Sequence, residues 1–341
     1  MKPRLQTPSA AALRRARPGS IMVPGLSLLV LGLGALGLLM LCACGGSGST
    51  TAGSPRATPS GSVSASQATT PSVASAPVRL LGSDSVAVTK KVVGAERAAL
   101  RSPTAAKLVR PYADDVVGDD YAFGAHFEGR AAVRKMFRKN VAEYSGARWV
   151  AGYAGRGWAV IEQRWDFTKN YGGTIELIVI QETRGGKIVH EGDYYQTIDN
   201  LPDGKPLTPV PLKSAPRTQD TAAAAEAVAL KYAAALQAKD AAAAAALSAP
   251  TIAFMDTASS TSGSSPGDVQ AYYDGAFKVP ADLAFTHLRY ALGCGWAAVI
   301  WTAESQSFGV DGDGVTMLEI RDDKIARETL YYTSTNVPFA P

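Results

Sequence analysis

Three charged side chains near the middle of the chain have the types and spacing that acid–base chemistry requires. Arg164 and Asp166 are one residue apart in "QRWDF", and Asp193 lies in "GGKIVHEGDYY", a turn followed by a strand-like run. Residues i and i+2 of a strand share a face, so Arg164 and Asp166 can point together into one interior, where Asp193 can meet them from another strand. Two carboxylates that share an arginine in a low-dielectric pocket can hold different protonation states, as a general acid and a general base must.

The same residues also allow a simpler interpretation. Together with Glu162, Arg164 and Asp166 alternate with their neighbours along the segment, so the alternative is a solvated outer face that bears an ion pair. In "GGKIVHEGDYY", His190 and Glu191 lie on opposite faces of the expected strand and cannot pair across one surface. His190 is expected at the surface, and neither residue is expected to belong to the site.

Further side chains are candidates for the wall of a ligand pocket. These candidates are Tyr112, Asp120, Tyr121, His126, Trp158 and Tyr195. His126 belongs to the loop "GAHFEG", which we expect near the mouth of the pocket. No cofactor and no metal ion are expected, because paired aspartates around a short strand are more often solvated turn residues.

The N-terminal segment has the pattern of an export signal. An apolar run from Ile21 to Cys44 ends in Leu41-Cys42-Ala43-Cys44, which resembles a bacterial lipobox. Residues 1–43 are therefore predicted to be a lipoprotein signal peptide. Cys44 would carry a fatty acyl chain such as palmitate, and the protein would be extracytoplasmic and anchored to the cell membrane. Because the run is long enough to span a bilayer, an uncleaved membrane anchor is the alternative.

Removal of this signal changes the charge argument. The remaining chain has 29 Lys and Arg against 30 Asp and Glu, a net charge of −1, so no nucleic-acid partner is expected. Residues 44–78 are mostly Gly, Ser, Thr, Ala and Pro, which predicts a flexible tether. With lipid on Cys44, Cys294 would have no partner within the chain, and its apolar neighbours predict a small buried hydrophobe.

The rest of the chain repeats itself. Lys187 and Tyr194-Tyr195 return as Lys324 and Tyr331-Tyr332 at an offset of 137, and Gly157-Trp158 returns as Gly295-Trp296 at 138. Offsets this steady predict a duplicated domain. The boundaries expected are 79–200 for the first domain, 201–220 for a linker and 221–341 for a degenerate second domain.

Both copies show the same order of elements. A helix over 85–110 or 221–247 comes first, followed by a short strand, a second short helix and long β-type runs with turns. This order predicts an α+β class, with two tandem cone-shaped barrels in each of which a curved antiparallel sheet wraps around helices.

The pattern resembles the SnoaL-like branch of the nuclear transport factor 2 superfamily. The motifs that carry the resemblance are "YADDVVGDD", "FEGRAAVRKMF", "GWAVIEQRWDF" and "GGKIVHEGDYY" in the first copy, and "GWAAVIW" and "DDKIARETLYY" in the second. The resemblance implies a cone-shaped α+β barrel. It leaves function open, because this superfamily contains isomerases, cyclases, hydrolases and non-catalytic binding domains.

The first copy is most similar to the limonene-epoxide hydrolase branch, which carries an Arg-x-Asp on a middle strand and an Asp before an aromatic pair on the last strand. That resemblance implies that water attacks an epoxide. Asp193 would be the general base, Asp166 the acid, and Arg164 the bridge between the two carboxylates. The water-holding Tyr and Asn of that branch would fall near Gly118 and Asp120, which are not equivalent to them.

The second copy lacks these residues. The positions of Arg164, Asp166 and Asp193 are taken by Thr302, Glu304 and Leu330. A pocket in the second copy is therefore expected to be apolar and inert.

Two hypotheses of function follow. The first is a lipid-anchored protein with two SnoaL-like domains that binds a small hydrophobic ligand or a protein partner. The alternative is a hydrolase or isomerase in the first domain, with a non-catalytic second domain. Expected partners are the membrane through lipid on Cys44, a small hydrophobic molecule, and either an intramolecular pairing of the two domains or a homodimer.

Overall fold

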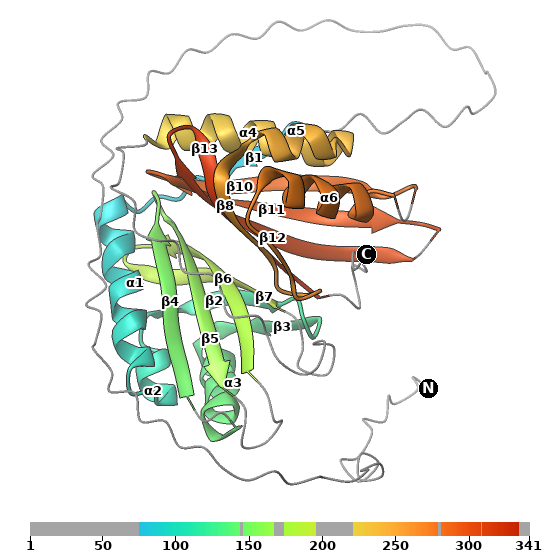
Figure 1. Cartoon of the computed structure of the whole chain (residues 1–341). Coiled ribbons are helices and arrows are strands. Elements are labelled where there is room, and N and C mark those ends of the chain that lie inside the picture. Colours follow the sequence, from blue (N-terminus) through green and yellow to red (C-terminus); the bar gives the residue numbers. More distant parts are fainter. Residues whose placement is uncertain are drawn as a thin grey trace, which may run out of the picture. The chain divides into compact units, whose positions relative to one another are not determined.

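The computed structural model describes residues 75–143, 146–166, 174–195, 221–278, 281–307 and 309–333. These residues form helices and two mainly antiparallel sheets (Figure 1), which is a mixed α+β architecture as expected. All of them belong to one compact unit of the chain. The expected signal peptide, nearly all of the tether and the linker 201–220 lie outside the described residues, so those predictions stay untested.

The first sheet and its helices make up what we call the N-terminal lobe. Its elements are α1 Val86–Leu100, α2 Ala105–Leu108, β2 Tyr112–Asp120, β3 Ala125–Glu128, α3 Gly129–Glu143, β4 Gly146–Ala154, β5 Trp158–Asp166, β6 Thr174–Arg184 and β7 Lys187–Tyr195. The strand order is β3-β2-β7-β6-β5-β4, in which only β2 and β7 run parallel.

The second sheet and its helices form the C-terminal lobe. Its elements are α4 Ala222–Ala238, α5 Ala241–Ala246, β8 Ser248–Asp256, β9 Thr261–Gly263, α6 Pro266–Ala276, β10 Ala284–Gly293, β11 Trp296–Ser305, β12 Val310–Arg321 and β13 Lys324–Tyr332. The strand order, β9-β8-β13-β12-β11-β10, repeats that of the N-terminal lobe, and the short strand β1 (Val78–Arg79) pairs with β10 at its edge. The offset of 137 to 138 residues therefore relates strands in matching places.

Local signals explain how the first helix of each lobe is built. The side chains of Ser85 and Thr221 accept hydrogen bonds from the backbone N–H groups of Val88 and Ala224 and so cap the first turn. The long helices expected over 85–110 and 221–247 are each divided in two. In the C-terminal lobe the break comes at Lys239, whose φ of 52° ends α4 before α5 begins.

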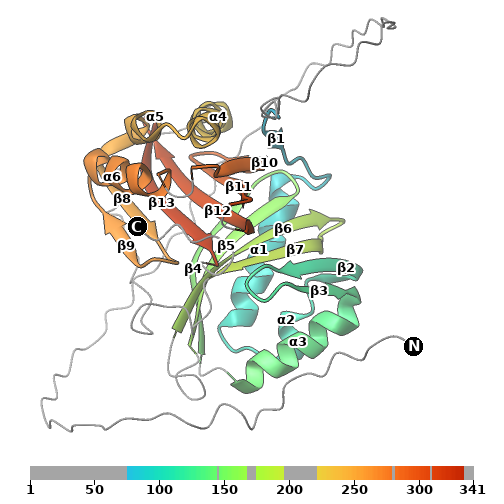
Figure 2. The ribbon, with the colours of Figure 1, turned by 90° about the vertical axis from the view of Figure 1, so that its right-hand side faces the viewer.

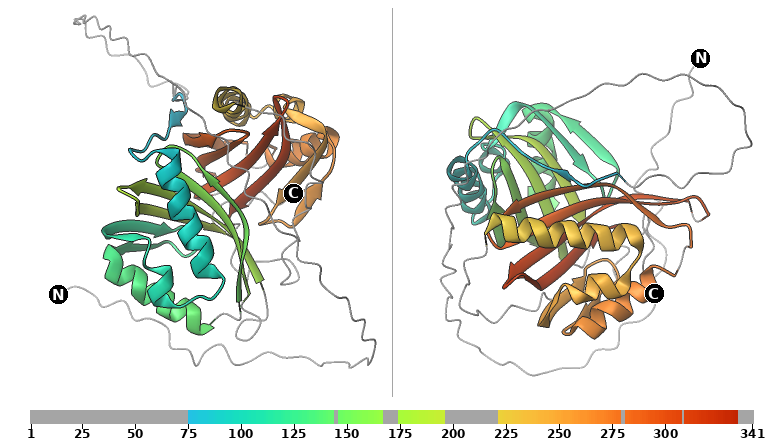
Figure 3. Two further views of the ribbon diagram at one scale, coloured as in Figure 1. Left: turned by 90° about the vertical axis from the view of Figure 1, so that its left-hand side faces the viewer. Right: turned by 90° about the horizontal axis from the view of Figure 1, so that it is seen from above.

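Three apolar clusters hold these layers together. One lies between α1 to α3 and the inner face of the first sheet, and a second lies between α4 to α6 and the inner face of the second sheet (Figures 2 and 3). The third joins the outer faces of both sheets and includes Val160, Ile178, Trp296 and Met317. The central strands of each sheet, such as β5, β6, β11 and β13, are therefore largely buried on both faces.

One prediction made from the sequence, that for Cys294, fails in the turn between two strands. Cys294 lies half-buried in the turn between β10 and β11, outside the strands, and it is disulfide-bonded. The prediction of a buried hydrophobe without a partner is therefore wrong. The other two cysteines of the chain, Cys42 and Cys44, lie outside the described residues. Among the described helices none is both long and apolar enough to cross a membrane.

Candidate functional site

A cavity of about 580 Å³ lies inside the N-terminal lobe. Its apolar wall consists of Leu100, Leu108, Phe127, Phe137, Trp165, Ile175, Leu177 and Val179, which come from helices and strands on all sides. The volume falls within the range of small-molecule sites in proteins. This cavity is the candidate site of the molecule.

The structure contradicts the predicted Arg164–Asp166–Asp193 site. Gln163 and Trp165 of β5 line the cavity, so Arg164 and Asp166, which alternate with them, are on the opposite face of the strand. Asp193 lines the cavity from β7. The prediction fails because both faces of β5 are buried, and alternation alone therefore cannot tell the inner face from the outer one.

The outer face of β5 bears an ion pair, as the alternative interpretation expected, but the pair is not solvated. The guanidinium of Arg164 pairs with the carboxylate of Glu176, which faces it across β5 and β6. An ion pair was expected here on a solvated face. The Glu176 side chain is only 3% exposed, however, so the pair is largely buried.

Two predicted pocket residues also lie outside the cavity. Tyr121 and Trp158 belong to the contact between the two sheets, where they border Ile300 of β11. The Tyr121 ring stacks on that of Tyr194, with 4.4 Å between the ring centroids. Aromatic residues are abundant on both faces of this sheet, so residue type alone did not separate the ligand pocket from the contact between sheets.

The other predicted pocket residues do line the cavity. They are Tyr112, Asp120, His126 and Tyr195. The Tyr195 hydroxyl donates to Asp120 at 2.8 Å, which holds this carboxyl group at the wall. His126 is exposed at the mouth, and its hydrogen bonds to Asp119 and Glu128 raise its pKa.

Sequence reasoning missed a buried polar cluster at the cavity wall. The Nε2 group of Gln181 donates to Glu96 at 2.9 Å and to Glu191 at 2.7 Å. Glu191 also accepts from the Tyr112 hydroxyl at 2.6 Å, and Glu96 accepts from Gln163 at 2.7 Å. Glu191 was expected to lie outside the site, yet it stands two residues before Asp193 and therefore shares its face. That spacing was the signal available in the sequence.

The buried carboxyl groups have strongly altered acidity. Burial raises the pKa of Glu96 to about 8 and that of Glu191 to about 7. Burial also raises the pKa of Asp193 well above its usual value, and the nearby charge of Glu191 raises it further. The carboxyl group of Asp193 makes no hydrogen bond or ion pair with any described residue. It is therefore the acid in this wall that is available to a bound molecule.

The matching interior of the C-terminal lobe is filled. Tyr232, Tyr273 and Trp301 fill this interior, and the space that remains between the side chains is about 10 Å³. The lining of this small space is mainly apolar, as expected for the second copy, and the fully buried Glu328 lies beside Tyr232 and Tyr273. The hydroxyl groups of Tyr232 and Tyr273 both donate to this carboxylate.

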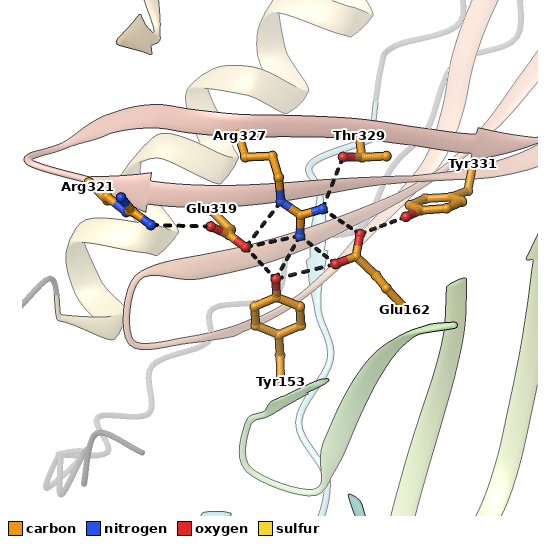
Figure 4. Close-up of polar contacts among 7 residues, drawn as sticks. All are labelled: Tyr153, Glu162, Glu319, Arg321, Arg327, Thr329 and Tyr331. Carbon is orange, nitrogen blue, oxygen red and sulfur yellow. Dashed lines mark hydrogen bonds and ion pairs between the residues drawn. The ribbon is translucent and has the colours of Figure 1, made fainter. Parts of the chain in front are cut away.

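A second polar cluster joins the two sheets on their outer faces (Figure 4). The guanidinium of Arg327 on β13 contacts Glu162 on β5, Glu319 on β12 and the hydroxyl of Tyr153 on β4. The Tyr331 hydroxyl donates to Glu162 at 2.7 Å. Glu162 is 1% exposed, so its charge depends on Arg327 for compensation.

Comparison with known proteins identifies one domain. The model of the SnoaL-like domain family matches residues 229–328, so the C-terminal lobe carries a SnoaL-like domain. No curated protein matches the chain.

Solved structures with an NTF2-like or ketosteroid isomerase-like fold are similar to parts of the chain. An NTF-2-like protein of unknown function from Burkholderia xenovorans is 19% identical over 32% of this chain and 83% of its own, with a TM-score of 0.30. A hypothetical protein with a ketosteroid isomerase-like fold from Catenulispora acidiphila, solved with trimethylamine, is 22% identical over 33% and 91%, with a TM-score of 0.29. An NTF2-like protein of unknown function from Mesorhizobium loti is 15% identical over 35% and 99%, with a TM-score of 0.30.

Proposed function

We propose that this chain is a binding protein whose N-terminal lobe holds a small hydrophobic molecule in its cavity. The observation that carries the proposal is the difference between two interiors built on the same strand order, one with about 580 Å³ of space and one with about 10 Å³. A cavity of this size with an apolar wall is the usual form of a small-molecule site.

In this proposal the two lobes are a duplicated SnoaL-like domain, and the C-terminal lobe has a structural role. Its filled interior leaves no room for a ligand, while its sheet buries one face of the N-terminal sheet through Trp296, Ile300 and Met317. The duplication would then provide within one chain the pairing that two copies would otherwise form.

Lipid anchoring is a further part of the proposal, and it competes with the disulfide of Cys294. The lipobox-like ending supports lipid on Cys44 and loss of residues 1–43. Cleavage would remove Cys42, and the lipid would occupy the Cys44 sulfur, so a lipidated chain has no cysteine left for an intramolecular bond to Cys294. We expect labelling by a fatty-acid analogue in the source cell to disappear in Cys44→Ala. Labelling that persists in this variant, or a full-length chain with an intact disulfide, would refute the anchor.

Binding can be tested with a neutral dye that fluoresces in apolar surroundings, N-phenyl-1-naphthylamine. We expect saturable binding of one dye per chain. The double variant Gln163→Trp with Leu177→Gly places in the N-terminal lobe the pair that fills the C-terminal lobe, where Trp301 faces Gly314. This variant should lose at least about tenfold in dye affinity because the space is filled. Equal dye binding by the folded variant would place the dye elsewhere and refute the cavity as the binding site.

A proton-transfer enzyme is the second candidate function. The observation that favours it is Asp193, which has no protein partner in an apolar cavity and a raised pKa, as a general base near neutral pH requires. The epoxide-hydrolase form of this hypothesis required Arg164 and Asp166, which do not line the cavity. Isomerisation of an unsaturated ketone, followed by its ultraviolet absorbance, should then fall by at least about a hundredfold in Asp193→Asn. Equal rates in the variant and the parent would remove the enzyme hypothesis.

A further inference from the structure

We propose that the molecule held in the N-terminal lobe carries a protonated amine, which the carboxyl group of Asp193 binds with support from Glu191. The inference rests on the binding function proposed above and names the chemical class of the ligand. It follows from the charges, the unpartnered polar atoms and the aromatic side chains of the cavity.

The charges that face the cavity are unbalanced. Its acidic residues come from α1, β2, α3 and β7 and are Glu96, Asp120, Glu143, Glu191 and Asp193. Its basic residues are His126 and Lys139, and both are exposed at the mouth. Among the described residues that line the cavity, no basic side chain is buried beside Glu96 and Glu191. A cation that enters with a ligand would pair with these carboxyl groups in their ionised form, since a buried carboxylate needs a paired charge.

Two polar groups, one in this wall and one bonded to its glutamates, lack hydrogen-bond partners in the described part of the chain. Asp193 is half-buried, and no described residue donates a hydrogen bond to its carboxyl group. Gln181 is fully buried, and its Oε1 atom has no hydrogen-bond partner although its Nε2 group contacts both glutamates. The ionised carboxyl group of Asp193 only accepts hydrogen bonds. A ligand that binds to this form must therefore bring hydrogen-bond donors, and an ammonium group brings up to three.

The remaining wall also suits a cation. Aromatic rings of Tyr112, Phe127, Phe137, Trp165 and Tyr195 border the cavity. The face of an aromatic ring attracts a cation, and the attraction is strongest where water is excluded. The same rings would pack against the apolar part of an amine.

The C-terminal lobe has the corresponding strands, but its described residues leave no open cavity beside them. Glu328 stands at the position of Glu191, where the hydroxyl groups of Tyr232 and Tyr273 both donate to its Oε1 atom, while its Oε2 atom has no hydrogen-bond partner among the described residues. Leu330 replaces Asp193. Acceptors without a described partner therefore occur in both lobes, but of the two described interiors only that of the N-terminal lobe has room for a ligand that could donate to one.

The proposal predicts a pH dependence with a definite sign. Without ligand, burial raises the pKa of Glu96 to about 8 and of Glu191 to about 7, and it raises that of Asp193 as well. A bound cation favours the ionised carboxylates, so binding releases protons. Amine affinity should therefore rise between pH 6 and pH 8, by up to about tenfold per pH unit for each proton released. A neutral acceptor ligand would need the protonated acids and would bind more weakly as pH rises.

The test compares three ligands that share one body: 4-phenylbutylamine, 4-phenyl-2-butanone and 4-phenylbutyrate. Each displaces the neutral dye from the full chain at pH 6, 7 and 8. We expect the amine to bind at least about tenfold more tightly than the ketone or the carboxylate at pH 8, since a charge-assisted hydrogen bond is the stronger kind. Asp193→Asn should remove this preference, so that the amine binds no more tightly than the ketone.

Asp115→Asn is the matched control, because Asp115 is an exposed carboxylate on β2 that does not line the cavity. It should leave the preference for the amine unchanged. If Asp193→Asn does not fold, Glu191→Gln serves as the second variant and should weaken the amine at pH 8. A ketone or carboxylate that binds as tightly as the amine, or a preference that survives in Asp193→Asn, overturns the proposal. In either case dye binding by the parent protein still supports the cavity, whereas absent dye binding refutes the proposed function itself.

Discussion

The interiors of the two lobes differ at matched positions on the same strands. In the N-terminal lobe Gln163 of β5 faces Leu177 of β6, and in the C-terminal lobe Trp301 of β11 faces Gly314 of β12. A Cβ atom on Gly314 would lie 2.2 Å from the Trp301 ring, so the glycine is what admits the indole. The sizes of two facing side chains therefore decide whether the interior is open or filled.

The first helix of each lobe repeats this difference. Glu96 and Tyr232 both stand eleven residues after the capping residues Ser85 and Thr221. Glu96 joins the acidic wall through Gln181, while Tyr232 fills the interior and donates to Glu328. One backbone order thus supports either a closed core or an open acidic cavity, and the choice is made by a few inward-facing residues.

The largest expected effect tests whether the C-terminal interior is a packed core. Trp301→Ala should lower the free energy of unfolding by about 4 kcal/mol, because the indole is 1% exposed and its loss leaves a closed void. Trp165→Ala is the matched change in the N-terminal lobe, where the indole already borders the open cavity. It should cost about 2 kcal/mol or less, since little new void is created. Urea unfolding measures both, and equal losses would contradict the comparison.

A second comparison concerns the two sides of the contact between the sheets. On one side Arg327 pairs with Glu162, while the positions matched by the offsets of 137 and 138 are His190 and Ile300. These two border a space of about 20 Å³ on the other side. The ion pair therefore occurs once, which makes the two sides unequal.

Arg327→Ala should destabilise the protein by about 3 kcal/mol, since it leaves Glu162 buried without a compensating charge. The double variant with Glu162→Leu should recover much of this loss. His190→Ala, at the matched position, should change stability by less than about 1 kcal/mol, because it removes no buried ion pair. Thermal unfolding is the measurement, and a double variant as unstable as Arg327→Ala alone would show that charge compensation is not the reason.

The smallest expected effect, counted per pH unit and per carboxyl group, is a pH dependence of stability without ligand. In the unfolded chain Glu96 and Glu191 ionise near pH 4.5, whereas in the folded protein their pKa values are about 8 and about 7. Between these limits the folded state binds more protons, so stability is greatest at low pH and falls as pH rises toward 8. The slope is about 1.4 kcal/mol per pH unit for each carboxyl group that stays protonated in the fold.

Variants can show how much of this pH dependence of stability comes from each lobe. Glu96→Gln with Glu191→Gln should flatten the profile more than Glu328→Gln, because the C-terminal lobe has one such glutamate, whose pKa burial raises to about 7. The melting temperature between pH 5 and pH 8 gives the comparison. A wild-type profile that rises over this range would contradict the assignment of buried, protonated acids.

Much of the fold could be predicted from the sequence because its signals are local. Capping side chains such as Ser85 and Thr221, the glycine turns and the offset of 137 to 138 residues give the elements, their order and their repetition. Which side of each strand faces inward could not be predicted, because the outer face is also buried and the two faces look alike in sequence. That ambiguity placed Arg164 and Asp166 inside and left Glu191 out.

The sequence by itself determined the α+β class, the repeated element order, the candidate role of Asp193 and the absence of its counterpart at Leu330. Only the tertiary structure decided that Glu96, Gln163 and Glu191 line the same cavity as that acid and that Gln181 joins the two glutamates. These side chains come from α1, β5, β6 and β7, and no local pattern records their distance from one another. The physical reason is that a cavity is defined by what several elements leave unfilled, and that depends on packing across the whole lobe.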